Sequence, residues 1–169
     1  MSQHANRQLT GAESASMRAA GDHASEVIAK NIAVTLKGLH QEVANRAYRA
    51  SNHLRNASLH VLRGQRSGKR YRIPHTRVKY QASKPGESPA NRTGIFRLSW
   101  RTQVRVEKQG SKFRAISSIE SDLRVGKWLL GEILERGTRR GMAPRPYKQA
   151  VRDRAAPQIQ ALYKKSYKT

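Results

Sequence analysis

One apolar stripe between residues 27 and 62 constrains this chain more than any other feature. Its members recur at steps of four or three residues, at Ile28, Ile32, Leu36, Leu39, Val43, Ala47, Ala50, Leu54, Ala57 and Val61. The mean step is close to the period of an α-helix, about 3.6 residues. Asp22 or Ser25 could cap the start, and Gly64 marks the end. The stripe therefore predicts a long amphipathic helix over residues 23–63.

Such a helix is long for a small domain. The chain has 169 residues, which fits one domain, whereas this helix would exceed about 50 Å at ~1.5 Å per residue. Either Gly38 allows a bend, or the helix projects and packs against other subunits. Residues 1–22 are polar and rich in Ala and Ser, so we expect a flexible N-terminal arm without a secretion signal.

Alternating patterns after the helix predict two hairpins. Residues 64–84 form a basic loop or hairpin in which Pro74 separates residues 70–73 from residues 77–80. Residues 100–107 and 112–119 form a second hairpin around a turn at 108–111. The neighbours Ala115 and Ile116 break the alternation and suggest a bulge.

Three further helices follow from caps and spacing. Thr93 is a candidate N-cap for a helix over 94–99, and residues 127–136 form a helix with Trp128 and Leu129 inward that ends at a left-handed Gly137. A C-terminal helix covers 147–165, with a kink or break expected next to Pro157. The predicted class is α+β: a long N-terminal helix, then a domain over 64–169. That domain has a small, mostly antiparallel sheet of about four strands, flanked by a short helix and the C-terminal helix.

Charge is the extreme feature of the composition. The chain has 34 Lys and Arg against 11 Asp and Glu, a formal net charge of +23. One stretch holds eight cations and no acid: Arg63, Arg66, Lys69, Arg70, Arg72, Arg77, Lys79 and Lys84. Such density implies a polyanionic neighbour, either DNA or an acidic protein surface. These eight residues are the candidate contacts.

Several classes of site are not expected. The chain has no cysteine, so disulfides and thiolate metal sites are excluded. The acids Asp122, Glu132, Glu135 and Asp153 are scattered and predict no metal site. The histidines of the stripe (His40, His53, His60) lack ligand partners at suitable spacing. We therefore expect no cofactor, no catalysis and no membrane span.

An ordered series of turn and corner motifs adds a family resemblance. The motifs are Gly86-Glu87-Ser88-Pro89-Ala90, Thr93-Gly94 with Leu98-Ser99, a β-hairpin, Leu134-Glu135-Arg136-Gly137-Thr138, and Arg145-Pro146-Tyr147. Over roughly residues 68–163 the chain resembles the tail-completion and head–tail joining proteins of double-stranded DNA phages. The resemblance implies a structural virion protein whose domain 64–169 forms a closed ring, with six or twelve copies.

The resemblance also implies where the protein acts and with what. The ring would lie in the neck or at the head-proximal end of the tail, after synthesis in the bacterial host cytoplasm. Its partners would be the adjoining neck, portal-side, tail-terminator and tail-tube proteins, with double-stranded DNA in the channel as a further candidate. The implied motif and interface residues are Gly86, Pro89, Thr93, Gly94, Glu135, Gly137, Thr138, Arg145, Pro146 and Tyr147. For Glu135 we expect an ion pair between subunits with Arg92 or Arg97, whereas Gly94 and Gly137 are expected to be conformational.

The main alternative is a free basic nucleic-acid-binding protein. The sequence pI of about 11.4 suits this function, and Tyr71, Tyr80 and Trp100 could stack on bases. It leaves the Pro and Gly motifs unexplained, and no helix-turn-helix, zinc-finger or RNA-binding aromatic signature is present.

Overall fold

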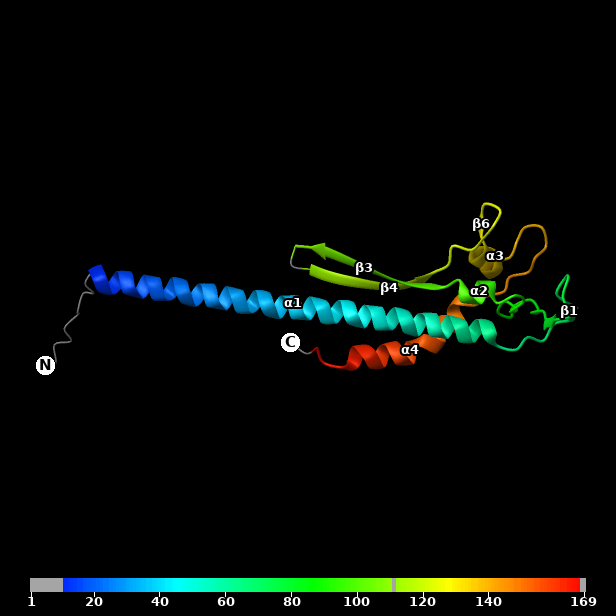
Figure 1. Cartoon of the computed structure of the whole chain (residues 1–169), viewed down its shortest axis with the longest axis horizontal. Helices are drawn as coiled ribbons and strands as arrows, with labels where there is room; N and C mark the ends of the chain where they lie inside the picture. The colour runs from blue at the N-terminus through cyan, green and yellow to red at the C-terminus, as the bar shows by residue number, and fades with distance from the viewer. Residues whose placement is uncertain (1–10, 111, 168–169) are drawn as a thin grey trace. The chain divides into compact units, whose positions relative to one another are not determined.

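The computed structural model describes residues 11–110 and 112–167. In chain order its elements are α1 (Gly11–Arg63), β1 (Arg70–Arg72), β2 (Lys79–Gln81), α2 (Ile95–Leu98), β3 (Arg101–Gln109), β4 (Lys112–Glu120), β5 (Arg124–Val125), β6 (Trp128–Leu129), α3 (Leu130–Arg136) and α4 (Lys148–Lys164). Figure 1 shows this order along the chain. The predicted α+β class, with its long first helix, is confirmed.

The first helix is longer than predicted. It begins at Gly11, so the flexible arm predicted for residues 1–22 is wrong for residues 11–22, and residues 1–10 lie outside the described part. The added turns contain several alanines, which favour helix more than any other residue. Its end at Arg63 agrees with the sequence.

Residues 42–167 form one compact unit, and residues 11–41 belong to a second. The domain boundary expected at residue 64 therefore falls instead between Gln41 and Glu42. The cause is packing, because Ala47, Ala50 and Leu62, in the C-terminal half of α1, are buried within the compact unit. The same apolar stripe thus supplies part of the core.

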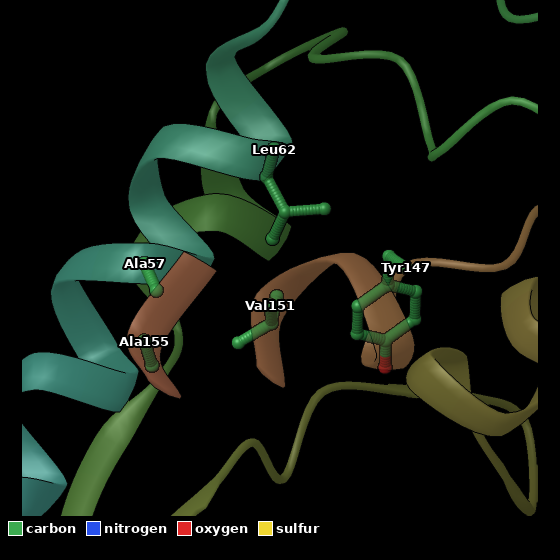
Figure 2. Packing of buried hydrophobic residues seen from close by; sticks show 5 residues of the cluster. All are labelled: Ala57, Leu62, Tyr147, Val151 and Ala155. Atoms are coloured by element: carbon green, nitrogen blue, oxygen red, sulfur yellow. The ribbon is translucent and has the colours of Figure 1, made fainter. Parts of the chain in front are cut away.

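The core of the compact unit lies between the last turns of α1 and the first turns of α4. Ala57 and Leu62 of α1 cluster there with Tyr147, Val151 and Ala155, as Figure 2 shows. Ala57 and Ala155 are 5% and 0% exposed, respectively. Small side chains at such a contact let two helices approach closely.

Three aromatic rings extend this core. Tyr147 packs edge-on against Phe96 and Trp100, with ring centroids 5.6 and 5.8 Å away, and Phe96 lies 5.5 Å from Trp100. Edge-to-face pairs at these separations are favourable beyond simple area burial. The phenol of Tyr147 also donates a hydrogen bond to the carbonyl of Gly131 at 3.3 Å. The aromatic cluster therefore ties α2 and β3 to the start of α4.

The strands form three separate antiparallel pairs within the described residues: β1 with β2, β3 with β4, and β5 with β6. This differs from the expected single sheet of about four strands. The β3–β4 hairpin contacts α1 instead of further strands, and Ser117 Oγ donates a hydrogen bond to the Ala47 carbonyl at 2.7 Å. Its register runs unbroken through Val106–Ala115 and Arg105–Ile116, so the predicted bulge is absent.

Two helix starts differ from the predictions. Gly94, with φ 80° and ψ −18°, is the N-cap of α2, and Thr93 provides no side-chain cap. Trp128 and Leu129 pair in β6 instead of entering a helix, and Trp128 is 63% exposed. The reason is a tight turn at Gly126, whose φ of 58° lets Val125 pair with Trp128.

The C-terminal helix continues through its proline. Helix α4 runs from Lys148 to Lys164 with Pro157 inside, so the chain does not break next to it. Pro157 is exposed, whereas Val151, Ala155 and Leu162 are buried on the other side of the same helix. Packing of both halves offsets the lost backbone hydrogen bond.

Arg46 is a buried cation that the sequence did not single out. It is 3% exposed, forms an ion pair with Glu42 at 2.9 Å, and its guanidinium lies 3.9 Å from the centre of the Tyr167 ring. It also donates to the carbonyls of Lys165 and Ser166. A buried charge is tolerated when its donors are satisfied in this way, so Arg46 holds the segment after α4 against α1.

Candidate interaction surfaces

The β1–β2 hairpin presents cations on one face. In its register Arg70 opposes Gln81, and Arg72 opposes Lys79. All four side chains are exposed. Like charges directly opposite one another destabilise a strand pair, so an anion bound at this face would relieve the repulsion between Arg72 and Lys79. We call the exposed side chains of Arg70, Arg72 and Lys79 the cationic face.

The other face of the same hairpin is aromatic. Tyr71 opposes Tyr80, with ring centroids 6.1 Å apart and the planes tilted by 33°. The guanidinium of Arg92 lies 6.0 Å from the centre of the Tyr80 ring. Tyr71 is 49% exposed. The β1–β2 hairpin therefore places charged side chains on one face and aromatic side chains on the other, as expected for alternating residues of a strand.

Seven of the eight predicted contact residues are exposed, and Arg66 is not. Arg63, Lys69, Arg77 and Lys84 join the three residues of the cationic face in being exposed. Arg66 instead donates to the carbonyl of Val61 at 2.7 Å and to that of Pro89 at 3.0 Å. Burial lowers the pKa of this guanidinium, and the charge of Glu87 opposes that change. Arg66 is therefore a structural cation, which caps the end of α1 and binds the loop around Pro89.

Glu87 organises the same loop. Its carboxylate accepts hydrogen bonds from the hydroxyl of Ser67, from the backbone N–H of Ser67 at 3.2 Å and from that of Lys84 at 2.9 Å. These hydrogen bonds, led by the Ser67 hydroxyl, lower the pKa of Glu87 to about 2. Glu87 of the Gly86–Ala90 motif thus holds the loop to Ser67 and Lys84.

Two of the resemblance motifs meet, although more than 50 residues separate them. The N–H of Gly86 donates to the carbonyl of Pro144 at 3.0 Å, and the hydroxyl of Ser88 donates to that of Pro146 at 3.0 Å. Pro89 is buried next to this contact. The two loops therefore form one corner, which we call the motif corner: residues 86–89 with residues 144–147.

Glu135 completes the motif corner from inside the same chain. Its Oε2 atom accepts from the backbone N–H groups of Tyr147 at 3.0 Å and Lys148 at 3.3 Å. Those N–H groups begin α4 and have no partner within the helix. The carboxylate thus caps α4 within its own chain, and the ion pair with Arg92 or Arg97 of another subunit stays a prediction.

Gly137 and Thr138 close the loop between α3 and α4. Gly137 has φ 76° and ψ −169°, which confirms the positive φ but places the residue outside the left-handed helical region. A β-carbon there would lie 2.5 Å from the Met142 carbonyl oxygen. Thr138 exchanges two hydrogen bonds with Met142, at 2.9 and 3.1 Å, and Arg145 N–H donates to the Leu134 carbonyl at 2.8 Å. These residues thus fix the backbone conformation of the loop in the folded chain.

A hollow of about 490 Å³ lies beside the motif corner. Its lining includes Arg92, Arg97, Arg124 and Arg145 and no carboxylate, together with Thr93, Gly94 and apolar residues such as Phe96 and Leu134. The Nε atoms of Arg97 and Arg145 are buried and lack a hydrogen-bond partner. The hollow is suited to an anionic or hydrogen-bond-accepting group.

Large apolar side chains are exposed at the rim of this hollow. Ile95 and Val125 line it and are 58% and 56% exposed, and Trp128, which pairs with Val125, is 63% exposed. Leu98, 61% exposed, lines an adjacent hollow that shares Leu123 with the first. We call Ile95, Leu98, Val125 and Trp128 the apolar rim. The sequence analysis missed it, although the Gly126-Lys127 pair could have indicated the hairpin that exposes Trp128.

Comparison with protein-family models, with curated proteins and with solved structures gives no match to this chain. Two further findings concern the described residues 11–110 and 112–167. No helix among them is both long and apolar enough to cross a membrane. Their His, Asp and Glu side chains form no group of three or more that could hold a metal ion.

Proposed function

We propose that this chain is a structural subunit of a tailed double-stranded DNA phage, which assembles with copies of itself into a ring in the neck or at the head-proximal end of the tail. The ring would join head and tail or complete the tail. The proposal starts from the ordered motifs of the sequence, which resemble those of tail-completion and head–tail joining proteins.

The observation that carries the proposal is the apolar rim beside the arginine-lined hollow. Exposed apolar patches on a subunit commonly mark protein–protein contacts, and tryptophan is enriched among the residues that dominate binding energy. A closed ring needs two different complementary patches on each subunit. The apolar rim and the hollow, which share Ile95 and Val125, would together supply one of these patches.

The motif corner supports the same function. Hydrogen bonds of Gly86, Ser88 and Glu135 connect residues 84–89 and α3 to the segment that begins α4. At Gly137 the backbone passes too close to Met142 for a side chain. A corner that is rigid before association lowers the ordering entropy lost when copies dock. The residues of the resemblance would then serve the ring by shaping the surfaces next to them.

Purified protein provides the first test. Light scattering with size-exclusion chromatography should give the molar mass of an assembly of six or twelve copies. Trp128→Ala should lower this mass, because it removes an exposed ring of the apolar rim. Tyr48→Ala is the matched control, because Tyr48 is an aromatic residue of similar exposure, 57%, elsewhere in the compact unit. Equal effects of the two substitutions would contradict a contact at the apolar rim.

Electron microscopy of phage particles made without this protein tests the biological role. Filled heads lying apart from finished tails are the expected result. Normal virions would overturn the proposal.

The cationic face favours a second candidate function, binding of nucleic acid. The opposed cations Arg72 and Lys79 would gain from bound phosphates, and Tyr71 offers an exposed ring for stacking. Arg70→Glu, Arg72→Glu and Arg77→Glu in one variant separate the candidates. Loss of salt-dependent DNA binding with an intact ring supports DNA contact, whereas failure to attach to head or tail with unchanged DNA binding supports docking onto an acidic protein rim.

A further inference from the structure

The N-terminal half of α1 carries large apolar residues that are exposed. Ile28, Ile32 and Leu36 are 58%, 54% and 47% exposed, and Met17 is 60% exposed. These side chains continue the stripe whose later members, such as Ala47 and Ala50, are buried in the compact unit. The stripe is thus a packing surface in the C-terminal half of α1, and its members in the N-terminal half are exposed.

The spacing shows that both halves share one face. From Ile28 through Leu39 to Ala50 the steps are four, four, three, four, four and three residues. This is an eleven-residue repeat, which keeps apolar side chains on one side of a long helix and is a known pattern for helix–helix association.

Residues 11–41 contain both residues that favour helix and residues that disfavour it. Seven alanines favour helix, whereas glycines and β-branched residues disfavour it, at Gly11, Gly21, Val27, Ile28, Ile32, Val34, Thr35 and Gly38. Most of the stability of a helix in a protein comes from packing of its apolar face. A partner along this stripe would therefore stabilise α1 from Gly11 onward.

Charge favours a second copy of this chain as the partner. Residues 11–41 contain three acids (Glu13, Asp22, Glu26) and three cations (Arg18, Lys30, Lys37), so the formal charges of this segment cancel. The whole excess of +23 lies elsewhere in the chain. A neutral helix offers nothing to a polyanion or to an acidic protein surface, but it can pack against an identical neutral helix without repulsion.

We infer that residues 11–41 pack through Ile28, Ile32 and Leu36 against the same segment of a second copy of this chain. The inference rests on the self-association that the proposed function also requires, but it uses a surface separate from the apolar rim. The contact would tether copies through α1 while their compact units make other interactions.

Single-cysteine variants test the inference in the full chain, which has no cysteine of its own. Ile32→Cys places a thiol on the stripe. Val34→Cys is the matched control, because two residues farther along an α-helix lie about 200° around its axis and Val34 is 71% exposed. In concentrated protein we expect a water-soluble thiol reagent to modify Cys at position 32 at least tenfold more slowly than at position 34.

Dilution distinguishes a second copy from a cover supplied by the same chain. The protection at position 32 should disappear on dilution together with part of the helical circular dichroism signal. Protection that persists at every dilution, or equal reactivity at the two positions in concentrated protein, would overturn the inference.

Charge insertion provides an independent readout. Ile28→Asp with Ile32→Asp should weaken association by at least tenfold in sedimentation equilibrium, and Val27→Asp with Val34→Asp should not. If rings of six or twelve copies form while position 32 remains fully reactive, the inference fails and the proposed function stands. If position 32 is protected but the protein stops at a dimer, the inference stands and the ring fails.

Discussion

The carboxylate of Glu135, in the last turn of α3, accepts the backbone N–H of Tyr147 at 3.0 Å, where α4 begins. One side chain thereby links the end of one helix to the start of the next, across the loop that contains Gly137 and Pro144. The two residues belong to separate motifs of the sequence, and their contact joins these motifs at the motif corner.

Removal of this cap should destabilise the compact unit. Because Glu135→Ala leaves the N–H groups of Tyr147 and Lys148 without their acceptor, we expect a loss of about 1 kcal/mol in the free energy of unfolding. Urea denaturation followed by tryptophan fluorescence measures it. Glu107→Ala, at an exposed position of β3, should change the free energy by less than about 0.5 kcal/mol; similar losses for both variants would refute the capping role.

Gly137 should tolerate no side chain. Gly137→Ala combines a positive φ with a β-carbon 2.5 Å from the Met142 oxygen, so a loss of about 2–4 kcal/mol is expected, more than the strain of the backbone alone. Gly141 is the control, since its φ is 102° but no atom lies within 4 Å of an added β-carbon. The difference between the two alanine variants in thermal unfolding isolates the steric clash.

Glu87 should make the protein sensitive to acid in a defined range. Because its folded-state pKa is lowered from 4.5 to about 2, the carboxylate stabilises the fold above about pH 4.5. That contribution is lost as the pH falls from about 4.5 to about 2. Nuclear magnetic resonance titration of Glu87 measures this pKa directly. In Ser67→Ala, which removes the largest cause of the shift, the pKa should rise toward 4.5, and an unchanged value would contradict the hydrogen bond.

Tyr147 should act mainly through packing. Tyr147→Phe removes one long hydrogen bond to Gly131, so the loss should be about 1 kcal/mol or less. Tyr147→Ala removes a ring that is 2% exposed, and about 3–5 kcal/mol should be lost. Calorimetry compares the two variants. Burial also raises the pKa of the Tyr147 phenol, so absorbance titration should show one tyrosine that ionises later than the others.

DNA binding, where it occurs, should depend on salt in a way that distinguishes the cations. Seven exposed residues between Arg63 and Lys84 give a slope of log K against log salt of about −6 if all contact phosphates. Substitution of Arg70, Arg72 and Arg77 by alanine should reduce the magnitude of this slope by about 3. Arg66→Ala should leave the slope unchanged and lower stability, because Arg66 binds the carbonyls of Val61 and Pro89. Fluorescence anisotropy across a salt series measures each slope.

Local patterns in the sequence specified the elements. The apolar stripe predicted the end of α1 at Arg63, alternation predicted both the β1–β2 and β3–β4 hairpins, and spacing predicted α4 to within a residue at each end. These features depend on residues a few positions apart, whose periodicity follows directly from helix and strand geometry. The same reasoning failed at Trp128, where a two-residue turn at Gly126 outweighed a helical spacing.

Tertiary structure alone decided which distant residues meet. Arg66 and Arg70 look alike in the sequence, yet Arg66 donates hydrogen bonds to the carbonyls of Val61 and Pro89, whereas Arg70 stays exposed. For Glu135 the sequence predicted only an ion pair with another subunit, whereas the fold brings the N–H groups of Tyr147 and Lys148 to its carboxylate. A hydrogen bond needs its donor and acceptor within about 3 Å, and only the packing of the core around Tyr147 determines which groups, far apart along the chain, come that close.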